Sequence, residues 1–157
     1  NIAVPHNIIG PKQKFDDPFR NVVSIMTNLI LQNRRPIIYG DGKQTRSFCY
    51  VNDLIDGFLQ FMDLSPSGEG LAVYPGPLNL GNPQEFTVLE LGHLVISLTG
   101  SSSKIVSLPL PSDDPFKRKP DITLAQNCLN DWHPKIDLEE GLKKTIEYFD
   151  NILIKRN

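Results

Sequence analysis

The stretch PIIYGDGKQTRSFCYVND, residues 36–53, sets the order of elements around which the rest of the chain is arranged. Pro36 to Tyr39 predicts a short strand, and Gly40-Asp41-Gly42 predicts a tight turn because glycine adopts positive φ angles at no steric cost. Arg46 to Val51 predicts a second extended segment. Asn52 or Asp53 is then a candidate N-cap for a helix, whose expected apolar face comprises Leu54, Ile55, Phe58, Leu59 and Met62.

Patterns of short strands and helices alternate on both sides of this stretch. Before it, residues 2–9 predict a buried strand that ends at Gly10-Pro11, and residues 21–31 predict a helix that Pro36 prevents from continuing. After it, the chain predicts a loop at 65–77, a minimal strand at 78–80, and a capping box at 87–90 that begins a helix ended by Gly100. The remaining elements are a strand at 104–110, a short helix at 121–129 and a last helix beginning at 137–140. This alternation predicts an α/β fold.

Composition argues against several classes of protein. The 157 residues suit a single domain, and 16 Lys+Arg against 18 Asp+Glu leave a formal net charge of −2. No run of five like charges occurs, so the sequence does not predict binding to nucleic acid or to anionic lipid. Every apolar stretch is far shorter than the roughly 20 residues that a membrane-spanning helix needs.

The cysteines, the histidines and the first ten residues carry little sign of further chemistry. Cys49 and Cys128 are far apart and predict two buried thiols, which favours a reducing cytoplasm and leaves a Golgi or endoplasmic reticulum lumen open. No second ligand lies at metal spacing from any of the three histidines, so we expect no metal site. Residues 1–10 lack an initiating Met and the features of a signal peptide, and we expect the chain to be cut from a longer one.

Two basic positions are candidate anion sites. Arg46 follows a turn and begins an extended segment, so its guanidinium is placed to bind a phosphate, although an ordinary surface charge fits equally well. Lys117-Arg118-Lys119 lies between acidic residues and prolines, which favours either a fixed anion site or a self-paired charge cluster. Tyr39 and Lys43 are four apart, but Gly-Asp-Gly between them cannot hold the helix that an acid–base pair would need.

Four motifs resemble those of a known enzyme family. Asn7-Ile-Ile-Gly-Pro-Lys12 resembles the N-x-Y-G-P-R motif of extended short-chain dehydrogenases that modify nucleotide sugars, with Ile9 and Lys12 in place of Tyr and Arg. Residues 39–48 (YGDGKQTRSF) with 51–53 (VND), 79–83 (NLGNP) and 113–121 (DDPFKRKPD) resemble UDP-glucuronate decarboxylases and their epimerase and dehydratase relatives. The resemblance runs in order along nearly the whole chain.

This resemblance implies that residues 1–157 are a single truncated domain, the carboxy-terminal nucleotide-sugar-binding portion of such an enzyme. The dinucleotide-binding half is absent, since the chain has no G-x-G-x-x-G turn, and the catalytic Tyr and Lys lie before residue 1. NAD would therefore be bound mainly by the missing half, and this chain alone would be inactive. The parent is expected to be a homodimer, and the isolated chain should expose apolar surface where the other half docks.

The resemblance also implies roles for individual residues. Asn7 would contact the sugar diphosphate of a UDP-sugar, Arg46 and Arg118 would clamp its pyrophosphate, and Asp121 would lie on the ribose side. Ile37 to Tyr39 would lie beside the uracil, and Val22 is included among the substrate-binding residues.

The type of reaction is less clearly indicated than the family. In decarboxylases an arginine that can meet the substrate carboxylate directly precedes a V-V-S sequence, whereas here Asn21 separates Arg20 from Val22, a rotation of about 100° on a helix. Residues 17–23 instead resemble some 4-epimerases, while residues 117–121 resemble decarboxylases. We expect UDP-glucuronate decarboxylation, with Arg20 as a possible carboxylate contact and no other catalytic residue in this chain. A UDP-glucose 4-epimerase or a sugar 4,6-dehydratase is the alternative, and a non-catalytic binding or assembly module is a third.

Overall fold

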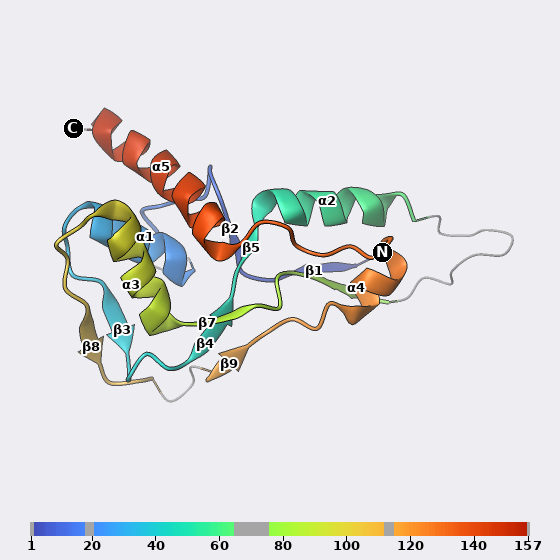
Figure 1. The fold of residues 1–157 in the computed structure, drawn as a ribbon, viewed down its shortest axis with the longest axis horizontal. Helices are drawn as coiled ribbons and strands as arrows, with labels where there is room; N and C mark the ends of the chain where they lie inside the picture. Colours follow the sequence, from blue (N-terminus) through green and yellow to red (C-terminus); the bar gives the residue numbers. More distant parts are fainter. Residues whose placement is uncertain (1, 18–20, 65–75, 112–114, 157) are drawn as a thin grey trace, which may run out of the picture.

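The computed structural model describes residues 2–17, 21–64, 76–111 and 115–156, and it confirms an α/β fold of short strands that alternate with helices (Figure 1). The strands are β1 (Ala3–Pro5), β2 (Ile8–Ile9), β3 (Ile37–Tyr39), β4 (Thr45–Ser47), β5 (Cys49–Tyr50), β6 (Leu78–Leu80), β7 (Glu85–Thr87), β8 (Val106–Leu108) and β9 (Lys117–Arg118). The helices are α1 (Val22–Leu31), α2 (Val51–Met62), α3 (Val88–Thr99), α4 (Thr123–Cys128) and α5 (Leu138–Arg156).

The strands form small sheets rather than one continuous sheet. β1 pairs with β6, β2 with β5, and β3 with β8, each pair parallel. β4 lies at the centre of a three-stranded sheet, antiparallel to β7 and parallel to β9. Because parallel neighbours cannot be joined by a tight hairpin, each parallel pair brings together segments far apart in the sequence.

Two apolar cores lie at opposite ends of this arrangement (Figure 1). In the first, α1, α3 and α5 pack together with β2, β3 and β5, around fully buried side chains such as Val23, Ile30 and Leu142. In the second, α2, α4 and β6 enclose Leu78, Leu80 and Trp132. The β4 sheet lies between the two cores, so its position depends on both.

Local signals in the sequence correctly predict several helix ends. The Thr87–Glu90 capping box begins α3, and Gly100 ends it in the left-handed conformation with φ 63°. The Asp137 carboxylate accepts a hydrogen bond from the Glu140 N–H at the start of α5. Gly40 and Gly42 have φ of 69° and 73° and form the turn after β3, where a Cβ at Gly42 would lie 2.9 Å from the Cβ of Leu89. The caps and the positive φ angles depend on neighbouring residues, whereas the close approach of Leu89 to Gly42 is a tertiary contact.

The predicted strand at residues 2–9 is wrong in its continuity and in its burial. Asn7 has φ 41° and breaks the segment into β1 and β2. The His6 N–H donates to the Leu80 carbonyl, whereas the Asn7 carbonyl accepts from the Cys49 N–H. The break therefore moves the chain from β6 to a different neighbour, β5, which a continuous strand could not reach. The predicted extended segment at 46–51 is likewise divided into β4 and β5, and Val51 already belongs to α2.

The predicted start and apolar face of α2 also need correction. Tyr50 is the N-cap residue, and Asp53 is buried within the first turn instead of capping the helix. Leu54 is buried, but Ile55, Leu59 and Met62 are 49%, 57% and 77% exposed. The apolar residues lie on two faces of the helix. The sequence pattern alone does not show which of these faces packs against a partner. An apolar stripe along α2 is thus uncovered.

Smaller differences concern the second half of the chain. The predicted strand at 104–110 is limited to β8, the predicted short helix begins at Thr123, and β7 has no counterpart among the predicted elements. Cys49 is buried as predicted, but Cys128 is only partly buried. Most of the predicted loop at 65–77 and the residues 113–114 lie outside the described residues. In the part of the chain that the structure describes, no helix is both long and apolar enough to cross a membrane.

We expect the Asp53→Ala variant to be destabilised by about 1–3 kcal/mol, since the buried Asp53 carboxylate accepts the Ile136 N–H at 3.0 Å and alanine would leave that donor unsatisfied. Urea denaturation of the variant and the unchanged chain measures the difference. Asp150→Ala, on the exposed side of α5, is the control. Loss of less than about 0.5 kcal/mol in Asp53→Ala would contradict this role for the carboxylate.

Candidate functional site

A cavity of about 390 Å³ lies between α1, β3, β4 and the start of α3. It brings together six of the predicted substrate-binding residues: Asn7, Val22, Ile37, Tyr39, Arg46 and Arg118. The remaining lining residues are Asn21, Ile25, Met26, Leu29, Ile38, Gln44, Phe48 and Val88. The volume is in the usual range of small-molecule pockets.

One end of the cavity is cationic because two arginines are paired across neighbouring strands. Arg46 on β4 is directly opposite Arg118 on β9. Arg46 is 9% exposed, and its Nη1 donates to the Thr45 carbonyl at 2.8 Å. Like charges at directly opposed positions of a sheet destabilise it, so this pair favours a bound anion between the guanidinium groups.

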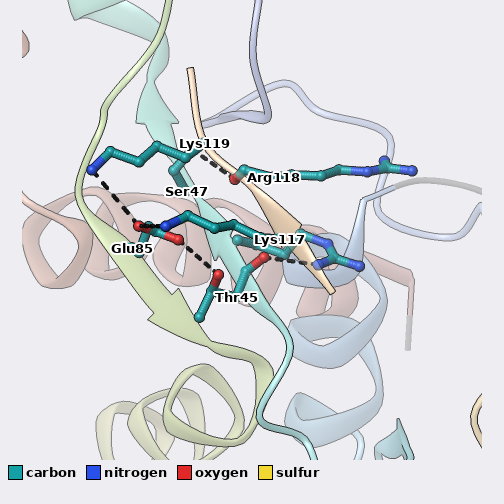
Figure 2. Close-up of polar contacts among 7 residues, drawn as sticks. Thr45, Ser47, Glu85, Lys117, Arg118 and Lys119 are labelled. Carbon is teal, nitrogen blue, oxygen red and sulfur yellow. Dashed lines mark hydrogen bonds and ion pairs between the residues drawn. The ribbon is translucent and has the colours of Figure 1, made fainter. Parts of the chain in front are cut away.

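The opposite face of the same sheet carries a carboxylate among cations (Figure 2). Glu85 on β7 accepts a hydrogen bond from the Thr45 hydroxyl at 2.7 Å and forms ion pairs with Lys117 and Lys119 at 3.1 and 3.7 Å. The hydrogen bond from Thr45 and then that from Lys117 lower the pKa of Glu85 below its usual value. The lysines are thereby paired away from the cavity, and Arg118 is the residue of this basic run that lines it.

The other end of the cavity is apolar. Its apolar lining includes Ile25, Met26 and Leu29 of α1, Ile38 of β3 and Val88 of α3. Gln44, which is 5% exposed, donates from its amide to the Tyr39 carbonyl at 2.9 Å and holds the turn against β3. A ligand with an anionic group at one end and a flat, weakly polar group at the other therefore fits the cavity.

Sequence reasoning missed part of this lining. Asn21 is the N-cap of α1, since its Oδ1 accepts the Ser24 N–H, and its amide also donates to the Ile8 carbonyl at 3.0 Å. An asparagine before an amphipathic helix is a recognisable capping signal that could have found it. The α1 residues were predicted as a helix face, but helical spacing does not distinguish residues that line a cavity from residues that fill a core.

The structure places one predicted substrate-binding residue, Asp121, away from this cavity. Asp121 lines a separate shallow cavity with Pro83 and Gln126 and accepts the Thr123 N–H at 2.9 Å. Hydrogen bonds from Thr123 lower the pKa of Asp121. Asp121 thus has a local partner at the start of α4 and is not brought to the arginines. Arg20 lies outside the described residues.

Cys49 is unsuited to act as a nucleophile. It is fully buried, and burial, followed by the negative charge of Asp53, raises the pKa of its thiol to about 12. The reactive form of cysteine is the thiolate, which is scarce at neutral pH for such a group. This position therefore contributes packing to the second core rather than chemistry.

Comparison with known proteins shows relatives along nearly the whole chain. Residues 2–76 match the NAD dependent epimerase/dehydratase family. UDP-glucuronic acid decarboxylase 1 of Arabidopsis thaliana is 42% identical over 156 residues, which are 99% of this chain and 33% of that protein. UDP-glucuronic acid decarboxylase 1 of Danio rerio is 42% identical over 97% of this chain and 34% of its own length.

A similar fold occurs in solved structures. The crystal structure of a UDP-glucose 4-epimerase from Thermotoga maritima, with UDP-glucose, superposes with a TM-score of 0.82 at 33% identity over 96% of this chain and 46% of that chain. The chain spans about a third of the length of the two curated decarboxylases.

We expect Cys49 to resist alkylation in the native chain, because its raised thiol pKa leaves almost no thiolate at about pH 8. Treatment with iodoacetamide followed by peptide mass spectrometry should show Cys128, which is partly exposed, modified before Cys49. Cys49 should become modified at the rate at which the chain unfolds, and the same peptide from chain unfolded in urea provides the reference. Equal labelling of both thiols in the native chain would show that Cys49 is accessible and ionisable.

Proposed function

We propose that the chain forms the nucleotide-sugar-binding portion of an NAD-dependent enzyme of the kind that includes the nucleotide-sugar decarboxylases and epimerases. The observation that carries the proposal is the position of Arg46 and Arg118, side by side at one end of a cavity that is apolar at the other. A nucleoside diphosphate has the matching pattern, since its diphosphate is anionic and its base is flat.

The residues of this chain would bind and orient the substrate. Arg46 and Arg118 would donate charged hydrogen bonds to the diphosphate, with Asn7 beside them at the bend between β1 and β2. The base would lie toward β3, next to Ile37 and Tyr39, whose side chains are 42% and 44% exposed at the rim of the cavity. Two fixed cations at the diphosphate would leave the sugar in one orientation.

We propose UDP-glucuronate as the substrate and decarboxylation as the reaction. The two decarboxylases at 42% identity support this, together with the similarity of Lys117 to Asp121 to decarboxylase sequences. A 4-epimerase or 4,6-dehydratase is the second candidate, favoured by residues 17–23 and by the 33% identity to a UDP-glucose 4-epimerase.

NAD, in this proposal, supplies the transient oxidation of the sugar at C4 and is bound mainly by residues beyond this chain. The sequence has no G-x-G-x-x-G motif, the glycine pattern that lets the backbone of a dinucleotide-binding unit approach a pyrophosphate. This chain's part is therefore confined to the substrate. A non-catalytic module would share that binding but lack turnover.

The missing dinucleotide-binding half is the partner that we propose for the exposed stripe on α2. Ile55, Leu59 and Met62 lie about one helical turn apart and are largely exposed. A contiguous apolar surface that is exposed to solvent commonly marks an interaction site. The chain also spans only about a third of its curated relatives, which leaves ample sequence to cover the stripe. We further propose that the complete enzyme is a cytoplasmic homodimer, and the free thiols of Cys49 and Cys128 support that compartment.

We expect Arg46→Ala, made in the full-length protein that carries this chain, to weaken UDP binding by about ten- to a hundredfold, the effect of losing one charged hydrogen-bonding group. Calorimetric titration with UDP measures it. Arg34→Ala is the matched control, since Arg34 is exposed after α1. This variant should bind UDP with the affinity of the unchanged protein. Unchanged UDP affinity in a folded Arg46→Ala protein would refute the diphosphate site.

The reaction is tested by incubating the full-length protein separately with UDP-glucuronate and UDP-glucose and separating the products by chromatography. We expect UDP-glucuronate to yield UDP-xylose and carbon dioxide, and Arg20→Ala to abolish this, because a carboxylate substrate needs a cation at the sugar's C5 substituent. Interconversion of UDP-glucose and UDP-galactose would establish the epimerase instead. UDP binding without any turnover would indicate the non-catalytic module.

A further inference from the structure

The alternation of side chains along β4 separates the charges of its sheet onto two faces. Thr45 is opposite Lys117 on β9 and opposite Thr87 on β7, while Arg46 is opposite Arg118. Successive residues of a strand point to opposite faces, so Thr45, Glu85 and Lys117 share one face and the two arginines share the other. Figure 2 shows Lys117 and Lys119 extending toward Glu85, and Arg118 extending the opposite way.

β9 is a weakly held strand in this arrangement. It has only two residues and lies at the edge of the sheet, where its backbone pairs with β4. Two further contacts come from the Thr45 N–H, which donates to the Phe116 carbonyl at 2.9 Å, and from the Ser47 hydroxyl, at 3.5 Å from the Arg118 carbonyl oxygen. Arg46 and Arg118 carry like charges at directly opposed positions, and such a pair by itself weakens the pairing of two strands.

Glu85 supplies the attraction that opposes this repulsion. Its carboxylate lies on β7, on the far side of β4 from β9, and reaches across to Lys117 and Lys119 while it accepts from Thr45 between them (Figure 2). The Glu85 side chain is 21% exposed, so solvent and salt screen its ion pairs less than they would screen those of a fully exposed carboxylate. One acidic group thereby holds the cations on both sides of Arg118 against the rest of the sheet.

We propose that Glu85 is a positioning residue for the diphosphate site: by holding Lys117 and Lys119 on the far face of the sheet, it keeps Arg118 beside Arg46 in the cavity. This inference rests on the proposed function, because it assigns Glu85 a part in binding the anion that the arginines meet. Glu85 itself does not line the cavity and acts through the register of β9.

The sign of the effect of Glu85→Gln distinguishes this role from simple electrostatics. Removing a negative charge near an anion site should strengthen anion binding by Coulomb's law. Positioning requires the opposite, because release of Lys117 and Lys119 lets β9 and Arg118 move away from Arg46. Glutamine retains an oxygen that accepts from Thr45, so the variant loses mainly the ion pairs.

The test is calorimetric titration of the full-length protein with UDP. We expect Glu85→Gln to weaken UDP binding roughly three- to tenfold, in the lower part of the range for residues coupled in one network of ion pairs. Glu139→Gln is the matched control: it also removes one lysine partner, Lys143, but on the exposed surface of α5, and should leave UDP affinity unchanged. Equal or tighter binding by Glu85→Gln would overturn the proposal.

A second variant shows whether Glu85 acts through Arg118 or only through general stability. In an Arg118→Ala background, Glu85→Gln should no longer weaken UDP binding, since the group that it positions is gone. A loss as large as that in the unchanged background would overturn the positioning role. If the unchanged protein binds no UDP, the proposed function fails, whereas UDP binding that is sensitive to Arg46→Ala but not to Glu85→Gln contradicts the role of Glu85 alone.

Discussion

The direct opposition of Arg46 and Arg118 across β4 and β9 is the constraint on which the candidate site depends. A parallel pairing in this register places two guanidinium groups on one face, and like charges at directly opposed positions weaken a sheet. The sheet tolerates this because its other face carries Glu85 between lysines. The arginine pair therefore favours anion binding but weakens the sheet, and the ion pairs of Glu85 stabilise it.

The two apolar cores hold the sheet in place. The first core, formed by α1, α3 and α5, fixes the helix that forms the apolar wall of the cavity. The second core, around Trp132, fixes the end of β1 and the bend at Asn7 through the pairing of β1 with β6. Since the interior of each core is closely packed, the central strand β4 has little freedom to shift, whereas β9 lies at the edge of the sheet and pairs only with β4 there. Rigid support of this kind suits a site that must orient its ligand.

Burial also separates groups that could react from groups that only pack. Cys49 lies in the second core with a thiol pKa of about 12, and the nearby Asp53 carboxylate is occupied by the Ile136 N–H. The cationic groups at the cavity, in contrast, lie on strands with one face open to a ligand. The described residues of the cavity thus combine two cations with apolar side chains, and α2 separately carries an exposed apolar stripe.

The sequence by itself determined the α/β class, the turn at Gly40 and Gly42, the capping box at Thr87, and Arg46 and Arg118 as candidate anion ligands. These signals are local, since a cap, a positive φ or an apolar period depends only on nearby residues. Tertiary structure alone decided that Arg46 lies against Arg118, that Glu85 reaches Lys117 and Lys119, and that Asn7 divides the first segment between two partners. The strands involved have two or three residues, too few to carry a pattern, and their register is set by packing between segments far apart in the chain.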